Sequence, residues 1–177
     1  MAVYKIDGFG TRNQTDGSGF DINRGHGQRF VTLYSEYTIT KGMAVAFDFN
    51  SSEPENGYGL HVIQADGDVL LKSQVIGIAT ETVAGTTSIP VKIKIQVGGY
   101  CDAACTDLSA CSPGQLLVCS NATDHASSPG ILAPIDTSAA QGSGGEGDQL
   151  PCAIHIADGS GDTVADSKVY LLNPANL

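Results

Sequence analysis

The chain has 177 residues, no tryptophan and only 6% aromatic residues. Basic residues are also scarce, since 9 Lys and Arg against 19 Asp and Glu give a formal net charge of -10. Nucleic acids are bound through clustered Lys and Arg, so this balance argues against DNA or RNA as a direct partner. No run approaches the ~20 apolar residues of a membrane span, and none forms a basic amphipathic face. We therefore expect no nucleic-acid and no membrane partner.

The chain also lacks the marks of secretion. Its first residues, Met-Ala-Val-Tyr-Lys-Ile-Asp-Gly, have neither the basic start nor the apolar core of a signal peptide. We therefore expect synthesis to end in the cytoplasm, where thiols stay reduced. Paired Cys-x2-Cys knuckles are absent as well, which leaves a zinc site unsupported. We interpret the cysteines as small buried hydrophobes. Cys101 and Cys105 form the one pair close enough in sequence to bridge or to bind a soft metal.

Signatures of catalysis are missing from the sequence. It contains no Gly-x-Ser-x-Gly elbow, no HExxH pair and no P-loop, and its four histidines are dispersed. The acidic stretches at 66–68 and 158–162 read as Asp-Gly turns with too few ligands for an EF-hand. We therefore predict no catalytic residue, no cofactor and no metal site, and a protein that is not an enzyme. A β-barrel hydrolase with dispersed catalytic residues is the alternative that a broad hydrolase screen would test.

The sequence does contain short stretches that alternate between apolar and polar residues. In residues 91–97 every second residue is apolar, which predicts that Val91, Ile93, Ile95 and Val97 face the core while Lys92, Lys94 and Gln96 face outward. Residues 30–34 and 43–49 are predicted strands for the same reason, with Met43, Val45, Phe47 and Phe49 on one bulky face. The one helical candidate is Cys101 to Cys111, where apolar residues recur at helical spacing. These patterns predict an all-β chain with at most one short helix.

The order of turns and strands in the first half recurs in the second. Gly42 starts an apolar strand and Gly114 does the same, while Ile76 aligns with Ile154 and Val91 with Val169. One such unit alone would expose an apolar face and unpaired strand edges. We therefore predict an internally duplicated small β-barrel or β-sandwich domain at residues 31–177, with a first half at about 31–100 and a second half at about 101–177.

Residues 1 to 30 differ from the rest, because they are rich in glycine and show no strand or helix period. We predict that residues 1–30 form an extended N-terminal arm that becomes ordered across a partner. Its spaced apolar residues are the predicted partner-binding anchors: Tyr4, Ile6, Phe9, Phe20 and Ile22.

Several stretches together resemble the small β domains encoded beside the major capsid proteins of tailed bacteriophages, the capsid decoration or cement proteins. The stretches are Thr40 to Val45, Val75 to Glu81, Gly85-Thr86-Thr87, Ile89 to Tyr100 and Ser112 to Val118, followed by a terminal strand. The resemblance covers about residues 38 to 177 and consists of a pattern without an invariant motif. The longer arm, the extra cysteines and the acidic loops depart from it.

That resemblance implies a virion structural protein that binds the outside of a phage capsid and stabilises contacts between capsid subunits. It implies the major capsid protein as partner, a homo-oligomer with a trimer favoured, and a location on the virion surface after synthesis in the host cytoplasm. The alternative is a receptor- or glycan-binding β module of a phage fibre or bacterial surface layer. Aromatic residues at loop tips would favour that alternative, and Tyr58 is the main candidate.

Overall fold

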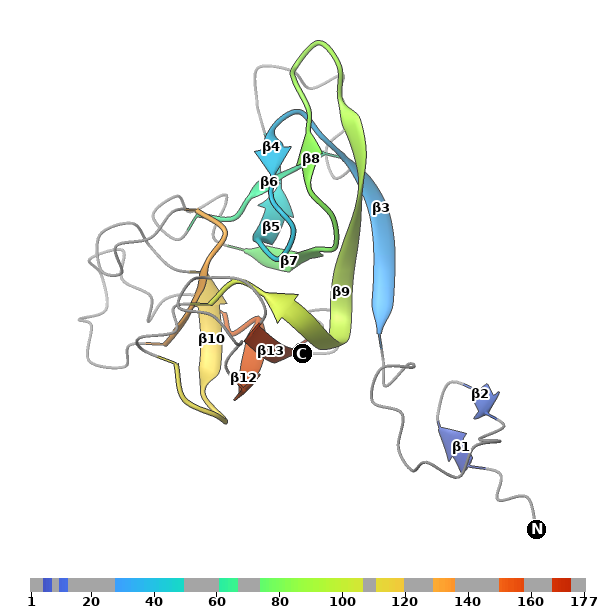
Figure 1. The fold of residues 1–177 in the computed structure, drawn as a ribbon, viewed down its shortest axis with the longest axis vertical. Coiled ribbons are helices and arrows are strands. Elements are labelled where there is room, and N and C mark those ends of the chain that lie inside the picture. Colours follow the sequence, from blue (N-terminus) through green and yellow to red (C-terminus); the bar gives the residue numbers. More distant parts are fainter. Residues whose placement is uncertain are drawn as a thin grey trace.

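The protein is represented by a computed structural model, which describes residues 28–49, 61–66, 74–106, 111–119, 129–135, 150–157 and 167–172, and the backbone of 5–7 and 10–12. In this part of the chain all regular structure is β-strand, which confirms the predicted all-β class. Most strands belong to one antiparallel sheet that curls into a half-barrel (Figure 1).

The main sheet has nine strands in the order β11-β10-β12-β13-β9-β7-β5-β6, with β3 paired to the edge of β9 opposite β7. Two smaller pairs, β1 with β2 and β4 with β8, lie outside it. The strands are β1 (Lys5–Asp7), β2 (Gly10–Arg12), β3 (Arg29–Ser35), β4 (Thr38–Ile39), β5 (Ala44–Phe47), β6 (Val62–Gln64), β7 (Val75–Ala79), β8 (Val83–Ala84), β9 (Val91–Ala104), β10 (Leu116–Cys119), β11 (Leu132–Pro134), β12 (Ala153–Ala157) and β13 (Ser167–Leu171).

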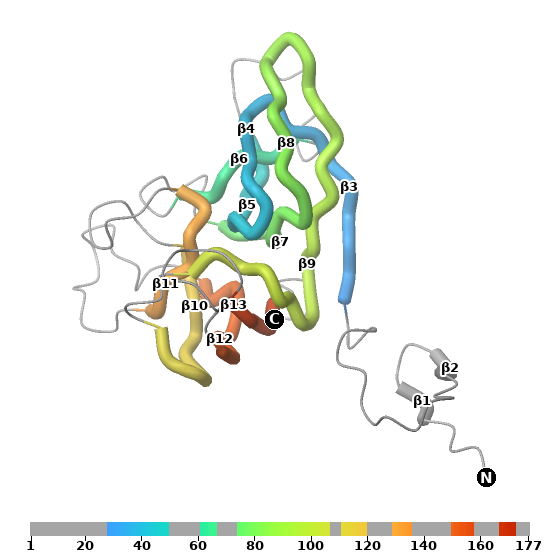
Figure 2. The backbone as a smooth tube through the Cα atoms, viewed as in Figure 1, coloured from blue at the N-terminus to red at the C-terminus, as the bar shows by residue number. Residues whose placement is uncertain are grey.

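Strand β9 connects the two halves of the fold. It is 14 residues long, and it pairs with β3 and β7 before its bend and with β13 after it (Figure 2). At the bend, Gly99 has φ +80, a conformation that glycine adopts without steric cost. The side chain of Gln96 donates to the carbonyls of Gly98 and Tyr100 at 3.2 and 2.6 Å. These bonds connect the backbone on the two sides of Gly99 through the side chain of Gln96.

The two halves have the same strand order. In the first half β3 neighbours β9, followed by β7, β5 and β6, and a parallel bridge between Tyr34 and His61 joins β6 back to β3. In the second half the last part of β9 neighbours β13, followed by β12, β10 and β11, and a parallel bridge between Thr106 and Leu132 joins β11 back to the end of β9. Each half-barrel is thus joined across its opening by one bridge of the same kind.

Individual hydrogen bonds recur as well. Gly42 N donates to Ala79 O and Gly114 N to His155 O, both at 2.8 Å. Both glycines have φ +88. Two further backbone hydrogen bonds of the first half recur in the second. The bond from Met43 N to Thr40 O corresponds to the bond from Gln115 N to Ser112 O. The bond from Ala65 N to Ala44 O corresponds to the bond from Ile135 N to Leu116 O. We call two residues equivalent when they hold the same place in the pairing of their halves. This agreement supports the predicted duplication, which stays a prediction about origin.

The equivalences correct the alignment made from sequence. The hydrogen bonds make Ala79 equivalent to His155, so Ile78 matches Ile154 and the predicted match of Ile76 with Ile154 is wrong by two residues. Likewise Ile95, and not Val91, is equivalent to Val169. Both errors are even numbers of residues. Side chains alternate with a period of two along a strand, so an even shift leaves the apolar pattern unchanged.

Burial confirms some of the predicted core and corrects the rest. Ile93 and Ile95 are buried while Lys92 and Lys94 are exposed, as predicted. Gln96 is buried, because its amide binds the bend described above. Strand β5 is buried on both faces, and not only on the predicted bulky one: Val45 packs in the core of the first half, whereas Ala44 and Ala46 pack toward the second.

The predicted helix from Cys101 to Cys111 is wrong over residues 101–104. These residues are the last part of β9 and pair with β13, from Tyr100 opposite Tyr170 to Ala104 opposite Ser167. The helical spacing of apolar residues was outweighed by strand pairing with a distant segment. Residues 107–110 lie outside the described part.

For the predicted arm, the structure describes the backbone of one antiparallel pair, with Lys5 opposite Arg12 and Asp7 opposite Gly10. The rest of residues 1–27 lies outside the described part. The boundary at residue 30 is close to the start of β3 at Arg29.

Candidate functional site

The outer face of β3 and β9 is the candidate site. Residues directly opposite each other in a sheet place their side chains on the same face. Thr32 lies opposite Lys94, Tyr34 opposite Lys92 and Phe30 opposite Gln96, so these residues share one face. The residues of the opposite face include Leu33, Ile93 and Ile95, which pack in the core. One face therefore builds the core, and the other displays aromatic rings and lysines.

The lysines lie over the rings. Lys94 Nζ is 4.6 Å from the centroid of the Phe30 ring, and Lys92 Nζ is 5.9 Å from that of Tyr34. Such cation–π contacts hold long side chains along the sheet while leaving their ammonium groups in water. Phe30 and Tyr34 are both exposed. We call this set the aromatic–lysine surface: Phe30, Thr32, Tyr34, Lys92 and Lys94.

Strand β3 also has a little-used edge. On one side it pairs with β9 over its full length, from Arg29 to Ser35. On its other side the described residues supply one backbone bridge, from Tyr34 to His61, beside the contact between the rings of these two residues. A strand edge with open N–H and C=O groups is a template for another strand. An extended segment of a partner could pair here and contact the aromatic–lysine surface at the same time.

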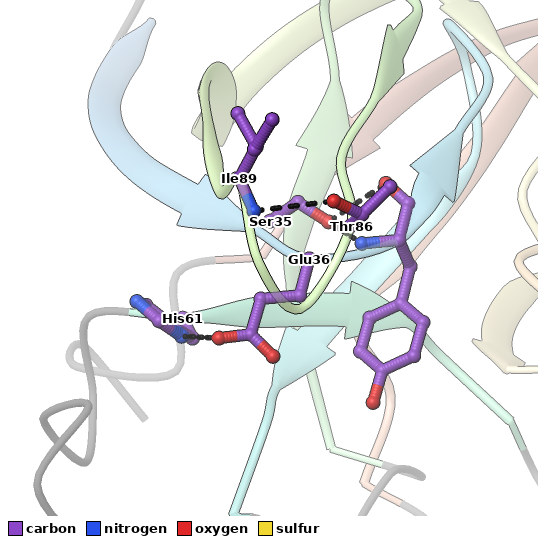
Figure 3. A network of polar contacts seen from close by, with 6 residues as sticks. Ser35, Glu36, His61, Thr86 and Ile89 are labelled. Carbon is purple, nitrogen blue, oxygen red and sulfur yellow. Dashed lines mark hydrogen bonds and ion pairs between the residues drawn. The ribbon is translucent and has the colours of Figure 1, made fainter.

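A polar network fixes the far end of β3. His61 Nδ1 lies 3.1 Å from Glu36 Oε1, and the Glu36 side chain is almost completely buried (Figure 3). The Ser35 hydroxyl contacts both the N–H and the C=O of Tyr37, each at 3.1 Å. In the neighbouring turn, Thr86 Oγ1 accepts the N–H of Ile89 at 3.1 Å (Figure 3). The network joins the end of β3 to the segment before β6, so it holds the edge strand in place.

The charge of this surface differs from that of the chain. Among residues 29–35 and 91–98 there are three basic residues, Arg29, Lys92 and Lys94, and no acidic one, although the chain carries a net charge of -10. A basic surface on an acidic protein favours an acidic partner and orients the approach. The chemistry offered is that of binding: ammonium groups, aromatic faces and a strand edge.

None of the predicted anchors belongs to the set of residues that defines the aromatic–lysine surface. Ile6 belongs to β1, where it pairs with Thr11, and only its backbone is described. Tyr4, Phe9, Phe20 and Ile22 lie outside the described residues. The sequence predicted the strand at 30–34 but not the aromatic–lysine surface that this strand forms with residues 92 and 94. The available signal was the spacing of Phe30, Thr32 and Tyr34 opposite the lysines of the next amphipathic strand.

All five cysteines are buried, and their burial confirms the prediction that they are small core residues. Burial raises the pKa of the Cys101 and Cys152 thiols, because a low-dielectric interior disfavours the thiolate. Within the described residues, no group of three or more His, Cys, Asp or Glu side chains is placed to hold a metal ion. The same part of the chain contains no helix with the length and apolar character of a membrane span.

Comparison with known proteins gave no match. Neither a protein-family model, nor a curated protein, nor a solved structure is detectably similar to this chain.

Proposed function

We propose that this chain is a virion structural protein that binds the outside of a phage capsid through the aromatic–lysine surface and stabilises contacts between capsid subunits. The resemblance of residues 38 to 177 to capsid decoration proteins supports the proposal. The structural observation that carries it is the edge strand β3, whose exposed Phe30 and Tyr34 lie under Lys94 and Lys92. The partner is the major capsid protein, and the protein acts on the virion surface after synthesis in the host cytoplasm.

The physical basis is recognition of an extended acidic segment. Pairing along β3 would satisfy the backbone of that segment, and the lysines would select acidic side chains on it. The rest of the chain is acidic and would repel an acidic partner segment, so binding of that segment would be restricted to this surface. No bond is made or broken in this task, and the predicted lack of enzymatic activity agrees with it.

Binding to purified capsids tests the proposal. Lys94→Glu reverses the charge over the Phe30 ring, and we expect it to weaken co-sedimentation with expanded capsids of the parent virus by about tenfold or more. Lys41→Glu is the control, because Lys41 is also exposed but lies outside the aromatic–lysine surface. Equal binding by both variants and the unmodified protein would reject this surface. Absence of capsid binding by the unmodified protein would reject the function.

A glycan- or receptor-binding module is the second candidate, and the exposed Phe30 and Tyr34 rings favour it because sugars stack on aromatic faces. A glycan array separates the two functions. Binding to a defined glycan that Phe30→Ala abolishes, with no binding to capsids, would establish the second candidate and reject the first.

A further inference from the structure

The first half has a face that the second half covers. The turn at Gly42 meets the end of β9: Cys105 N donates to Gly42 O at 2.8 Å, and a Cβ on Gly42 would lie 2.6 Å from the carbonyl oxygen of Ala103. Next to it, Ala44 N donates to Gly130 O at 2.7 Å, and Gly130 N donates to Ala65 O. As a result Ala44 and Ile78 are sealed inside the protein.

The equivalent face of the second half is open. Gly114 has the same φ of +88 as Gly42, yet a Cβ placed on it would meet no atom of the described residues within 4 Å. Leu116, equivalent to Ala44, is 44% exposed, whereas Ala44 is 0% exposed. Tyr170, equivalent to the buried Gln96, is 40% exposed.

The exposed Leu116 and Tyr170 form one apolar row across the sheet with the half-buried Ile154 and Tyr100. Leu116 lies opposite Ile154, Ile154 opposite Tyr170, and Tyr170 opposite Tyr100, so the row crosses β10, β12, β13 and β9 on a single face. We call it the second-half row. Large apolar residues that are contiguous on a surface, and not scattered singly, mark interaction sites.

Cys105, which covers the Gly42 turn of the first half, also has an equivalent residue that is partly exposed. The pair Leu33–Ile93 in the first half is equivalent to the pair Ala104–Ser167 in the second. Tyr34 follows Leu33 and Cys105 follows Ala104, so Tyr34 is equivalent to Cys105. Cys105 is 2% exposed because it packs on the Gly42 turn, whereas Tyr34 is 37% exposed. Within the part of the chain that the structure describes, therefore, a contact of this kind is made once, between the Gly42 turn and Cys105. Its equivalents, the Gly114 turn and Tyr34, lie in opposite halves of the same molecule, where the Gly114 turn is exposed and Tyr34 is partly exposed.

We propose that two copies of this chain associate head to tail, with the Tyr34 end of one copy packed on the Gly114 turn and the second-half row of the next. The contact between chains repeats one part of the contact that joins the two halves within a chain, the packing of the Gly42 turn on Cys105. It uses different surfaces on its two sides, so it is heterologous and continues until it closes into a ring or extends as a chain. This contact covers Tyr34, so a second copy and a capsid segment would compete for that end of the aromatic–lysine surface. Self-association requires no capsid, and it can therefore be tested apart from the proposed function.

Sedimentation velocity of the full chain without capsids tests the contact, with added salt to screen the repulsion between copies that each carry a charge of -10. We expect the unmodified protein to form oligomers in a concentration-dependent way. Tyr34→Asp and Tyr170→Asp each place a carboxylate in the contact, and each should raise the dissociation constant at least about tenfold. Leu116→Asp replaces Tyr170→Asp if that variant fails to fold. Ile89→Asp is the control, because Ile89 is exposed but lies outside both surfaces.

Mixing the two variants gives the sharpest outcome. Tyr34→Asp keeps an intact second-half row, and Tyr170→Asp keeps an intact Tyr34, so a head-to-tail contact predicts that the mixture forms a 1:1 dimer while each variant alone stays monomeric. Failure of the mixture to pair would overturn the head-to-tail arrangement. A monomeric unmodified protein, or oligomers that Tyr170→Asp leaves unchanged, would overturn the contact itself.

Discussion

The two halves of this protein share a strand order and a set of backbone hydrogen bonds, yet they bury different faces. In the first half Ala44, Ile78 and Gln96 lie on a covered face, and their equivalents Leu116, Ile154 and Tyr170 lie on an open one. The backbone pattern of the unit is therefore compatible with either outcome. The outcome depends on whether a neighbouring unit is present, and among the described residues the first half alone has one.

The cores of the two halves also differ in chemistry. Ile39, Phe47 and Ile76 pack in the first core, and the equivalent positions in the second are Cys111, Cys119 and Cys152. Thiols replace larger apolar side chains there, and the second core is completed by Ala44, Ala46, Ala65 and Ile78 from the first half. The second half thus relies on the first for part of its packing, while the first half has a more self-contained apolar core.

The largest expected difference comes from placing a charge at equivalent positions. Ala44→Asp buries a carboxylate that has no prepared partner, and we expect it to lower the free energy of unfolding by about 3–5 kcal/mol. Leu116→Asp places the same carboxylate on an exposed site and should change that free energy by less than about 0.5 kcal/mol. Chemical denaturation of both variants measures the two effects. Equal destabilisation would mean that the Leu116 face is covered within the monomer.

Truncation of the equivalent isoleucines should show the same asymmetry at a smaller scale. Ile78→Ala removes a fully buried side chain, and we expect a cost of about 2–5 kcal/mol. Ile154→Ala removes a half-buried one and should cost less than about 1.5 kcal/mol. The comparison requires dilute protein, because association would stabilise the Ile154 side. Melting curves that fall together would contradict the assignment of a covered and an open face.

Alkaline pH should affect the second core through its thiols. Burial holds the pKa of Cys152 and Cys101 above the value of 9.0 of a free thiol, so the folded protein keeps protons that the unfolded chain releases at high pH. Below the unfolded pKa both states are protonated and there is no effect. As pH rises above it, the free energy of unfolding should fall by about 1.4 kcal/mol per pH unit for each such thiol.

Denaturation in reductant between neutral and alkaline pH measures this slope. Cys152→Ala removes one of these thiols, so it should reduce the slope by about 1.4 kcal/mol per pH unit. A slope that Cys152→Ala leaves unchanged would show that other groups set the alkaline limit.

Local patterns predicted much of the fold. The alternation at 91–97 predicted the buried Ile93 and Ile95 and the exposed lysines, and the glycines at 42 and 114 marked the two equivalent turns. The alignment between the halves slipped by two residues at Ile154 and by four at Val169, because a period of two cannot distinguish even shifts. The strand at Cys101–Ala104 was missed because its apolar spacing also suits a helix, and its true partner β13 is distant in sequence.

The candidate surface was harder to predict. Phe30, Val31, Leu33 and Tyr34 are all apolar or aromatic, so the sequence does not tell which of the two faces of β3 is buried. The answer came from pairing: Leu33 lies opposite the buried Ile93, whereas Tyr34 lies opposite the exposed Lys92. The distinction between the covered Gly42 turn and the open Gly114 turn likewise depends on contacts between distant segments, which no local pattern encodes.

The most direct test of the comparison between the halves is the pair of substitutions Gly42→Ala and Gly114→Ala. Both glycines have φ +88, so alanine costs the same backbone strain of about 1–2 kcal/mol at each. At Gly42 alone the new methyl group also meets the carbonyl of Ala103. We predict that dilute Gly42→Ala protein loses about 1–3 kcal/mol more unfolding free energy than Gly114→Ala protein. Equal losses would show that the two turns have the same surroundings and would contradict the account.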